Sequence, residues 1–203
     1  MPAQVPAFTF GGPRVAPEQP SSESQKLWES VVLIELIADL RPRAGLLPAD
    51  AGVRAHARLL VSRAHDTLHG AFRAFFFRGE RAEAVLAPLD AFQALLAPAR
   101  AGGYAAGPWT LADAVVAPLL VRLVRLAGYE IGKYPVGEGK RLLKALGEPR
   151  FARLMAYYEL LWARPSVQET WDEVRAAFPA MRREGRAEAA PWPSGRGVVT
   201  FLS

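Results

Sequence analysis

Helical periodicity over most of the chain is the feature that most constrains this fold. Apolar residues recur at three- and four-residue spacing from Val53 to about Phe77, and Asp50 is placed to cap the first turn. The segment over about 111–127 is apolar almost all round and contains Pro118, so we expect a kinked helix at the centre of a bundle. Further helices are predicted over about 80–96, 139–146, 149–163 and 166–178, the last with a capping box formed by Ser166 and Glu169.

The first 48 residues have a different pattern. Proline, glycine and serine separate two short strand candidates, Ala7–Phe10 and Gln25–Trp28, and a short helix is predicted over 31–40, ended by Arg41 and Pro42. This lead segment is too short to bury a core of its own. We therefore predict a mainly α protein with a β-β-α segment over 1–48, an all-helical domain over 49–180 and a flexible tail over 181–203.

Composition excludes several classes of protein. Of 203 residues, 51% are hydrophobic and none is cysteine, which argues against disorder and excludes a disulfide scaffold or a cysteine-ligated metal within this sequence. The formal net charge of +5 comes from basic residues that alternate with acidic ones along predicted helices, a pattern that favours solvated helix faces over a nucleic-acid partner. No apolar run approaches the ~20 residues that span a membrane. We expect a soluble, cytoplasmic protein with no membrane partner.

A pair of histidines is the strongest metal candidate. His65 and His69 stand four apart on the long predicted helix, with Asp66 beside them. That spacing can hold a metal ion, but no third ligand is evident in the pattern. We therefore favour partly exposed helical histidines and predict no metal site.

Thr110 and Asp113 form the sharpest local motif. The Thr110 hydroxyl can accept from the Asp113 amide while the Asp113 carboxylate accepts from the Thr110 amide, which makes a capping box at the start of the central helix. In a buried setting its loss would cost about 1–2 kcal/mol. This motif is structural and carries no chemistry.

Two short segments together suggest recognition of a small peptide. A cis Val5-Pro6 bond at a strand start would leave the backbone of Val5 free to pair with an extended peptide. Ser30, at a helix start, offers a seat for a carboxylate, and Glu29 can accept from an ammonium group. An α-amino-acid head next to a peptide backbone, as in γ-glutamyl-cysteinyl-glycine, has that shape. The alternative is a turn proline and an ordinary helix start.

Three segments resemble the cytosolic glutathione transferases. Val5–Phe8 looks like the cis-proline segment of their thioredoxin-like domain, Leu27–Ser30 followed by Ile34–Ile37 like their strand–Glu-Ser–helix element, and Thr110–Asp113 with Pro118 like the capping box of their central helix. The resemblance implies that Gln4 and Val5 hold the cysteinyl part of glutathione and that Glu29 and Ser30 hold its γ-glutamyl end. In this reading Pro6, Thr110 and Asp113 are structural. The second substrate, a small electrophile, would bind beside the long first helix and the central helix.

The sequence departs from that family at its start. The family's thiol-activating Tyr, Ser or Cys lies before the cis-proline, in a strand–helix–strand unit, whereas Met1 here almost adjoins Pro6. We therefore assign no catalytic residue and no cofactor other than glutathione as co-substrate. Two functions stay open. One is a transferase of detoxification type, active once a complete N-terminal domain is supplied. The other is a non-catalytic helical module for interaction or homodimer formation.

Overall fold

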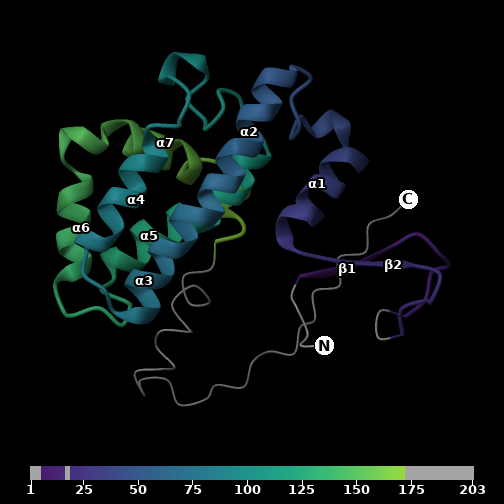
Figure 1. Ribbon diagram of the computed structural model, residues 1–203, viewed down its shortest axis with the longest axis horizontal. Coiled ribbons are helices and arrows are strands. Elements are labelled where there is room, and N and C mark those ends of the chain that lie inside the picture. Colours follow the sequence, from purple (N-terminus) through teal and green to yellow (C-terminus); the bar gives the residue numbers. More distant parts are fainter. Residues whose placement is uncertain (1–5, 17–18, 172–203) are drawn as a thin grey trace.

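The computed structural model describes residues 6–16 and 19–171 and has two parts, a helical bundle and a small β-β-α segment at its side (Figure 1). The segment comprises β1 (Ala7–Phe10), β2 (Gln25–Trp28) and α1 (Ser30–Leu40). The bundle comprises α2 (Ala51–Arg63), α3 (Gly70–Arg78), α4 (Glu83–Gln93), α5 (Leu111–Gly128), α6 (Glu138–Leu146), α7 (Ala152–Trp162) and the short α8 (Pro165–Gln168). The predicted mainly α class, with a β-β-α start and a helical bundle, is confirmed. The domain boundaries stay a prediction, and the tail over 181–203 lies outside the described residues.

The two strands form an antiparallel ribbon in which Ala7 pairs with Trp28 and Phe10 with Gln25. The long connection between them is held by Ser24, which is buried and donates from its hydroxyl to the Gly11 carbonyl at 2.7 Å. Gly12 is needed nearby because its φ is +72° and a Cβ would lie 2.7 Å from the Ser24 hydroxyl. Both predicted strands are thus confirmed, with one ribbon as their only sheet in the described residues.

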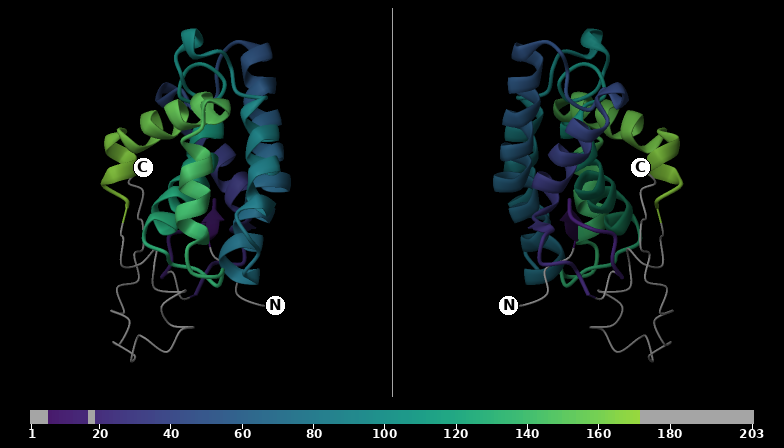
Figure 2. Two further views of the ribbon diagram at one scale, coloured as in Figure 1. Left: turned by 90° about the vertical axis from the view of Figure 1, so that its left-hand side faces the viewer. Right: turned by 90° about the vertical axis from the view of Figure 1, so that its right-hand side faces the viewer.

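A continuous helical rod forms one edge of the bundle in both side views (Figure 2). It is built from α2, a π-helical turn over Ala64–His69, and α3. Asp50 caps its first turn, as predicted, by accepting from the Val53 amide at 2.8 Å. The apolar stripe predicted from Val53 to Phe77 does face the core, and Leu60 and Phe75 are fully buried.

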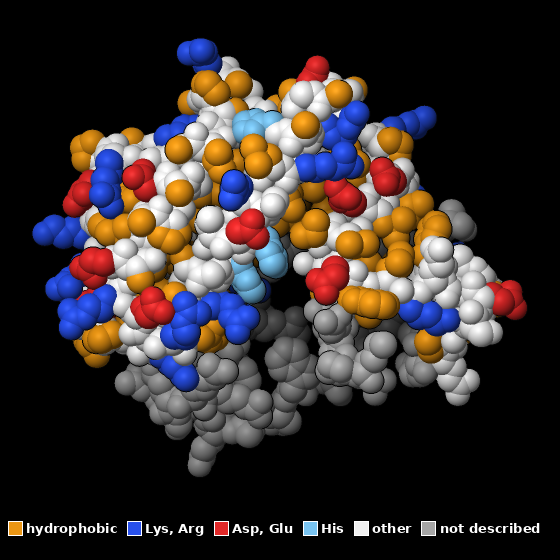
Figure 3. Space-filling model, in the orientation of Figure 1, with side chains coloured by type: hydrophobic (Ala, Val, Ile, Leu, Met, Phe, Trp, Pro, Cys, Tyr) orange, Lys and Arg blue, Asp and Glu red, His pale blue; other side chains and the backbone are white. Residues whose placement is uncertain are grey.

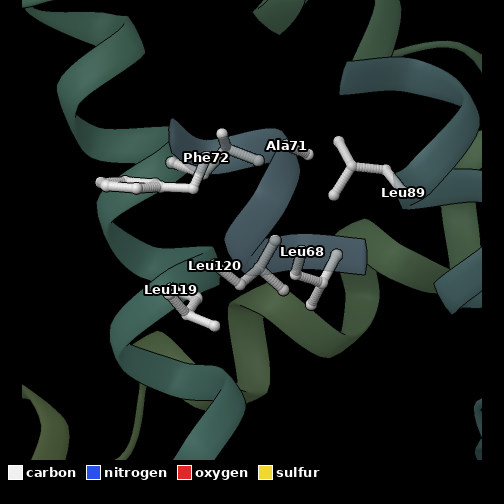
Figure 4. A pocket seen from close by; sticks show the side chains of 7 residues that line it. Leu68, Ala71, Phe72, Leu89, Leu119 and Leu120 are labelled. Atoms are coloured by element: carbon white, nitrogen blue, oxygen red, sulfur yellow. The ribbon is translucent and has the colours of Figure 1, made fainter. Parts of the chain in front are cut away.

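The central helix α5 lies among the other helices and carries the core. Leu111, Val116 and Leu120 are almost inaccessible to solvent, and Pro118 lies inside the helix, as the sequence predicts. A cavity of about 10 Å³ between the rod and α5 is lined by leucine side chains (Figure 4). It has room for about one water molecule and is a packing defect rather than a ligand site.

Three helix predictions need correction. The helix predicted over about 80–96 is shorter: α4 begins only at Glu83, because Arg81 and Ala82 belong to the turn that precedes it, and it ends at Gln93. The helix predicted over 149–163 starts as a 3-10 turn over Pro149–Phe151, and its α-helical part, α7, begins at Ala152. The capping box of Ser166 and Glu169 is wrong. Proline preorganises the first helical position, so α8 begins at Pro165, Arg164 is its N-cap and Ser166 lies inside the helix. Residues 172–178 of that prediction lie outside the described part.

No helix in the described residues is long and apolar enough to cross a membrane.

Candidate functional site

The ribbon brings two of the predicted site segments to one end. Because Ala7 pairs with Trp28 in antiparallel register, Pro6 and Glu29 follow at the same end of the two strands. Pro6, Glu29 and Ser30 are all exposed there. Gln4 and Val5, and therefore the predicted cis bond, lie outside the described residues.

Glu29 has an unusual backbone at the junction of β2 and α1. Its φ is +72° and its ψ is 112°, a conformation that costs a residue with a side chain on the order of 1–3 kcal/mol. Glu29 is one of two non-glycine residues with positive φ in the described chain. Strain of this kind tends to collect at ligand clamps, where the surrounding structure holds it in place. Nothing in the sequence pattern signals this conformation.

The start of α1 is left open. Glu29 is the N-cap and its side chain caps no amide, and the first helical hydrogen bond runs from the Leu33 amide to the Glu29 carbonyl at 3.0 Å. The amides of Ser30, Val31 and Val32 therefore precede the helical ladder. Together with the hydroxyl of Ser30 they form a set of donors that suits a carboxylate.

Contacts with the bundle hold α1 in place. Leu33 and Ala38 of α1 are buried, and the Arg58 guanidinium on α2 pairs with the Glu35 carboxylate at 2.9 Å. The loop after α1 is tied to the central helix, because the Leu111 amide donates to the Leu46 carbonyl at 2.9 Å. The middle of α1 is thus anchored to the rod, and the loop after α1 is anchored to the start of α5.

The predicted capping box at the start of α5 is present. The Asp113 carboxylate accepts from the Thr110 amide at 2.7 Å and from its hydroxyl at 3.1 Å, and the Thr110 hydroxyl accepts from the Ala112 amide. Asp113 also accepts from the Ala105 amide and the Tyr157 hydroxyl, each at 2.9 Å. These last two partners were not predicted.

Burial sets the protonation of this cluster. It raises the pKa of Asp113, and the four hydrogen-bond donors oppose that shift without cancelling it. It also raises the pKa of Tyr157 well above its usual value, aided by the charge of Asp113, so the phenol keeps the proton it donates. The cluster is enclosed in protein, and its structural role stays a prediction.

A cavity of about 320 Å³ lies on the other side of α5. Two indoles, Trp109 and Trp171, form part of its wall, Arg122 contributes its charge, and Ser166 and Thr170 contribute hydroxyls. The Trp171 indole nitrogen is buried with no hydrogen-bond partner among the described residues. The cavity touches the central helix, as expected for the second substrate, but none of its lining residues comes from the long rod.

The histidine pair predicted on the rod lies on its π-helical turn. The rings of His65 and His69 stack with centroids 5.9 Å apart. Histidine side chains border the notch between the bundle and the ribbon (Figure 3). No group of three or more His, Cys, Asp or Glu suited to a metal ion occurs in the described part of the chain.

Comparison with known proteins identifies the fold and its family. Among solved structures, glutathione transferase Omega 1C from Trametes versicolor superposes with a TM-score of 0.81 at 41% identity, covering 89% of this chain and 75% of that one. Omega 2C from the same organism gives 0.80 at 38%, covering 90% and 77%. Omega 2S, solved with 2,4-dihydroxybenzophenone, gives 0.77 at 42%, covering 89% and 77%. The chain belongs to the glutathione transferase family. No protein-family model and no curated protein matches the sequence.

This transferase-family chain therefore has the fold and family that its three motifs predicted. The structure brings Pro6, Glu29 and Ser30 together and keeps Thr110 and Asp113 in the core, apart from them. Sequence reasoning missed the indole-walled cavity, since Trp109 and Trp171 are distant in sequence and share no periodic pattern.

Proposed function

We propose that this chain binds glutathione at the open start of α1, with catalysis dependent on an activating group outside these 203 residues. Glu29 accepts from the ammonium of the γ-glutamyl head, and Ser30 with the first α1 amides holds its carboxylate. Gln4 and Val5, outside the described residues, are assigned the cysteinyl part. The family reaction is attack of the glutathione thiolate on an electrophile, assisted by proximity.

One observation supports this assignment above the others. The strained Glu29 stands next to exposed, uncapped amides at the end of the ribbon that also carries Pro6. A side-chain cap, such as Asp50 provides for α2 and Thr110 for α5, would satisfy one of those amides at a gain of about 1 kcal/mol. A bound carboxylate would provide the same hydrogen bonds and would also benefit from the helix dipole.

The cavity beside α5 is our candidate for the second substrate. Its two indoles favour a planar aromatic compound, and Arg122 favours one with an acidic group. A related transferase, Omega 2S, has been solved with 2,4-dihydroxybenzophenone, an aromatic compound with phenolic hydroxyls. Cytoplasmic location, detoxification and homodimer formation stay predictions.

Thermal unfolding with and without glutathione tests the binding site. At ten times its dissociation constant a ligand stabilises a protein by about 1.4 kcal/mol, which for a chain of this size raises Tm by about 3–6 °C. We expect such a rise at millimolar glutathione for the wild type, a smaller one for Glu29→Gln and none for Glu29→Ala. Glu35→Ala on the same helix, whose side chain pairs with Arg58, is the matched control and should keep the shift. A wild type that does not respond contradicts the proposal.

Conjugation of a model aryl halide tests the catalytic part. We expect negligible turnover from the 203-residue chain, because the family's activating residue lies on an element before the cis-proline. Rates typical of the family would show that an activating group is present and that this part of the proposal is wrong.

A non-catalytic interaction module has support of its own. Large apolar side chains are exposed on the ribbon and on α1, with Trp28 46% and Val32 48% accessible. Exposed apolar surface of this kind commonly marks an interaction site. Sedimentation distinguishes the two functions: a well-behaved monomer that binds glutathione favours the transferase-type site, whereas an oligomer indifferent to glutathione favours the module.

A further inference from the structure

The three histidines of this chain fall into two environments. The imidazole Nε2 of His56 lies 2.8 Å from the Leu95 carbonyl oxygen and is engaged in a hydrogen bond. His65 and His69 lie on the π-helical turn, with their rings 24° from parallel and 5.9 Å apart between centroids. No hydrogen bond to protein holds either ring in the described chain. They form a pair of imidazoles on one helix face, four residues apart.

A carboxylate lies near one of these rings. The Oδ1 of Asp66 lies 3.6 Å from Nδ1 of His65, with the two side chains 55% and 74% exposed. That separation is longer than a hydrogen bond, so Asp66 leaves the ring of His65 free to turn.

The pair can converge on one ion. Zinc lies ~2.0–2.1 Å from an imidazole nitrogen, so the two Nε2 atoms must approach to roughly 3–3.5 Å. His65 is exposed and His69 is only partly buried, so rotation of the side chains can bring the rings together without moving the backbone. With two protein ligands, water fills the remaining positions of the ion.

We propose that His65 and His69 form a two-histidine site for a divalent transition metal ion that favours imidazole, such as Zn²⁺. Borderline ions of this class are bound well by neutral imidazole, whereas Mg²⁺ and Ca²⁺ prefer oxygen ligands. An ion held by both rings cross-links the start and the end of the π-helical turn. It therefore stabilises the rod in the segment where its α-helical hydrogen bonding is interrupted.

Zinc titration of the untagged full chain by calorimetry, in buffer without glutathione or other thiols, tests this site. We expect one ion per chain for the wild type. His65→Ala and His69→Ala should each weaken binding at least tenfold, because a single imidazole is left.

The matched control is His56→Ala, which removes the other histidine from the same rod and should bind zinc as the wild type does. Since His65 is exposed, its alanine variant should fold, which circular dichroism can verify. Absence of zinc binding by the wild type, or unchanged binding by His65→Ala and His69→Ala, overturns the proposal. Neither result bears on the glutathione site, because no glutathione is present.

Discussion

At the scale of single residues, Asp113 is a side chain that connects three segments of the bundle. Its carboxylate is inaccessible to solvent and joins the start of α5 to the loop at Ala105 and to Tyr157 on α7. A buried carboxylate is costly unless its oxygens accept hydrogen bonds, and here four donors reach it. The motif that the sequence indicates as a local cap is thus also a tertiary contact between three segments.

Removal of the Tyr157 hydroxyl tests that contact. Tyr157→Phe keeps the ring and its packing but takes one donor from a buried charge, so we expect a loss of about 1–3 kcal/mol in the free energy of unfolding by urea. Tyr104→Phe is the matched control, because the Tyr104 hydroxyl has no hydrogen-bond partner among the described residues, and it should change stability by less than about 0.5 kcal/mol. Equal stability of the two variants would show that the Tyr157 hydrogen bond contributes nothing.

At the scale of elements, short-range signals in the sequence were sufficient for some features and not for others. Both strands, the Asp50 cap and the Thr110–Asp113 box were predictable because their partners lie within a few residues or follow one period. The π-helical turn was not, because a helix that widens for one turn keeps nearly the same apolar pattern. The φ of Glu29 was not predictable either, since that strain is imposed by how β2 and α1 pack rather than by the residue itself.

Helix starts in this bundle also depend on distant side chains. The Glu138 carboxylate on α6 accepts from the Ala82 amide, before α4, at 2.9 Å, and only 5% of Glu138 is accessible. The two residues are 56 apart in sequence, so no local pattern reveals the pair. Glu130 similarly accepts from the Gly137 and Lys140 amides at the start of α6.

Loss of the Glu138 carboxylate should therefore destabilise the α4–α6 contact. Glu138→Ala leaves the buried Ala82 amide without its partner, and we expect the free energy of unfolding to fall by about 1–3 kcal/mol. Glu83→Ala is the control, because Glu83 and Glu138 both contact Arg141, but Glu83 does so on the surface at 3.6 Å. Surface pairs contribute ~0–1 kcal/mol, so the control should stay near the wild type. If the two variants lose the same free energy of unfolding, the ion pair with Arg141 accounts for the loss, and the hydrogen bond from the Ala82 amide does not.

At the scale of the whole molecule, the two parts differ in how they are stabilised. The bundle has a continuous buried core around α5, while the ribbon has two strands of four residues whose side chains are exposed or half-buried. A two-stranded ribbon is marginal by itself and depends on packing against a neighbour. The proposed glutathione site lies within the β-β-α segment, where the ribbon meets α1, so its strained residue is in the less stable part.

Hydrogen exchange should expose this difference in stability. Amides of α5 can exchange only when the core opens, so we expect them to be the slowest, whereas β1 and β2 need only a local opening and should exchange orders of magnitude faster. Glutathione, if bound at Glu29 and Ser30, should slow exchange in α1 and β2, because a bound ligand raises the free energy of every opening that destroys its site, and amides of α5 that exchange by global unfolding should slow as well. Ribbon amides as protected as those of α5 in the absence of glutathione would mean that the chain unfolds as one cooperative unit. The strain at Glu29 would then be held by the whole fold rather than by the local junction.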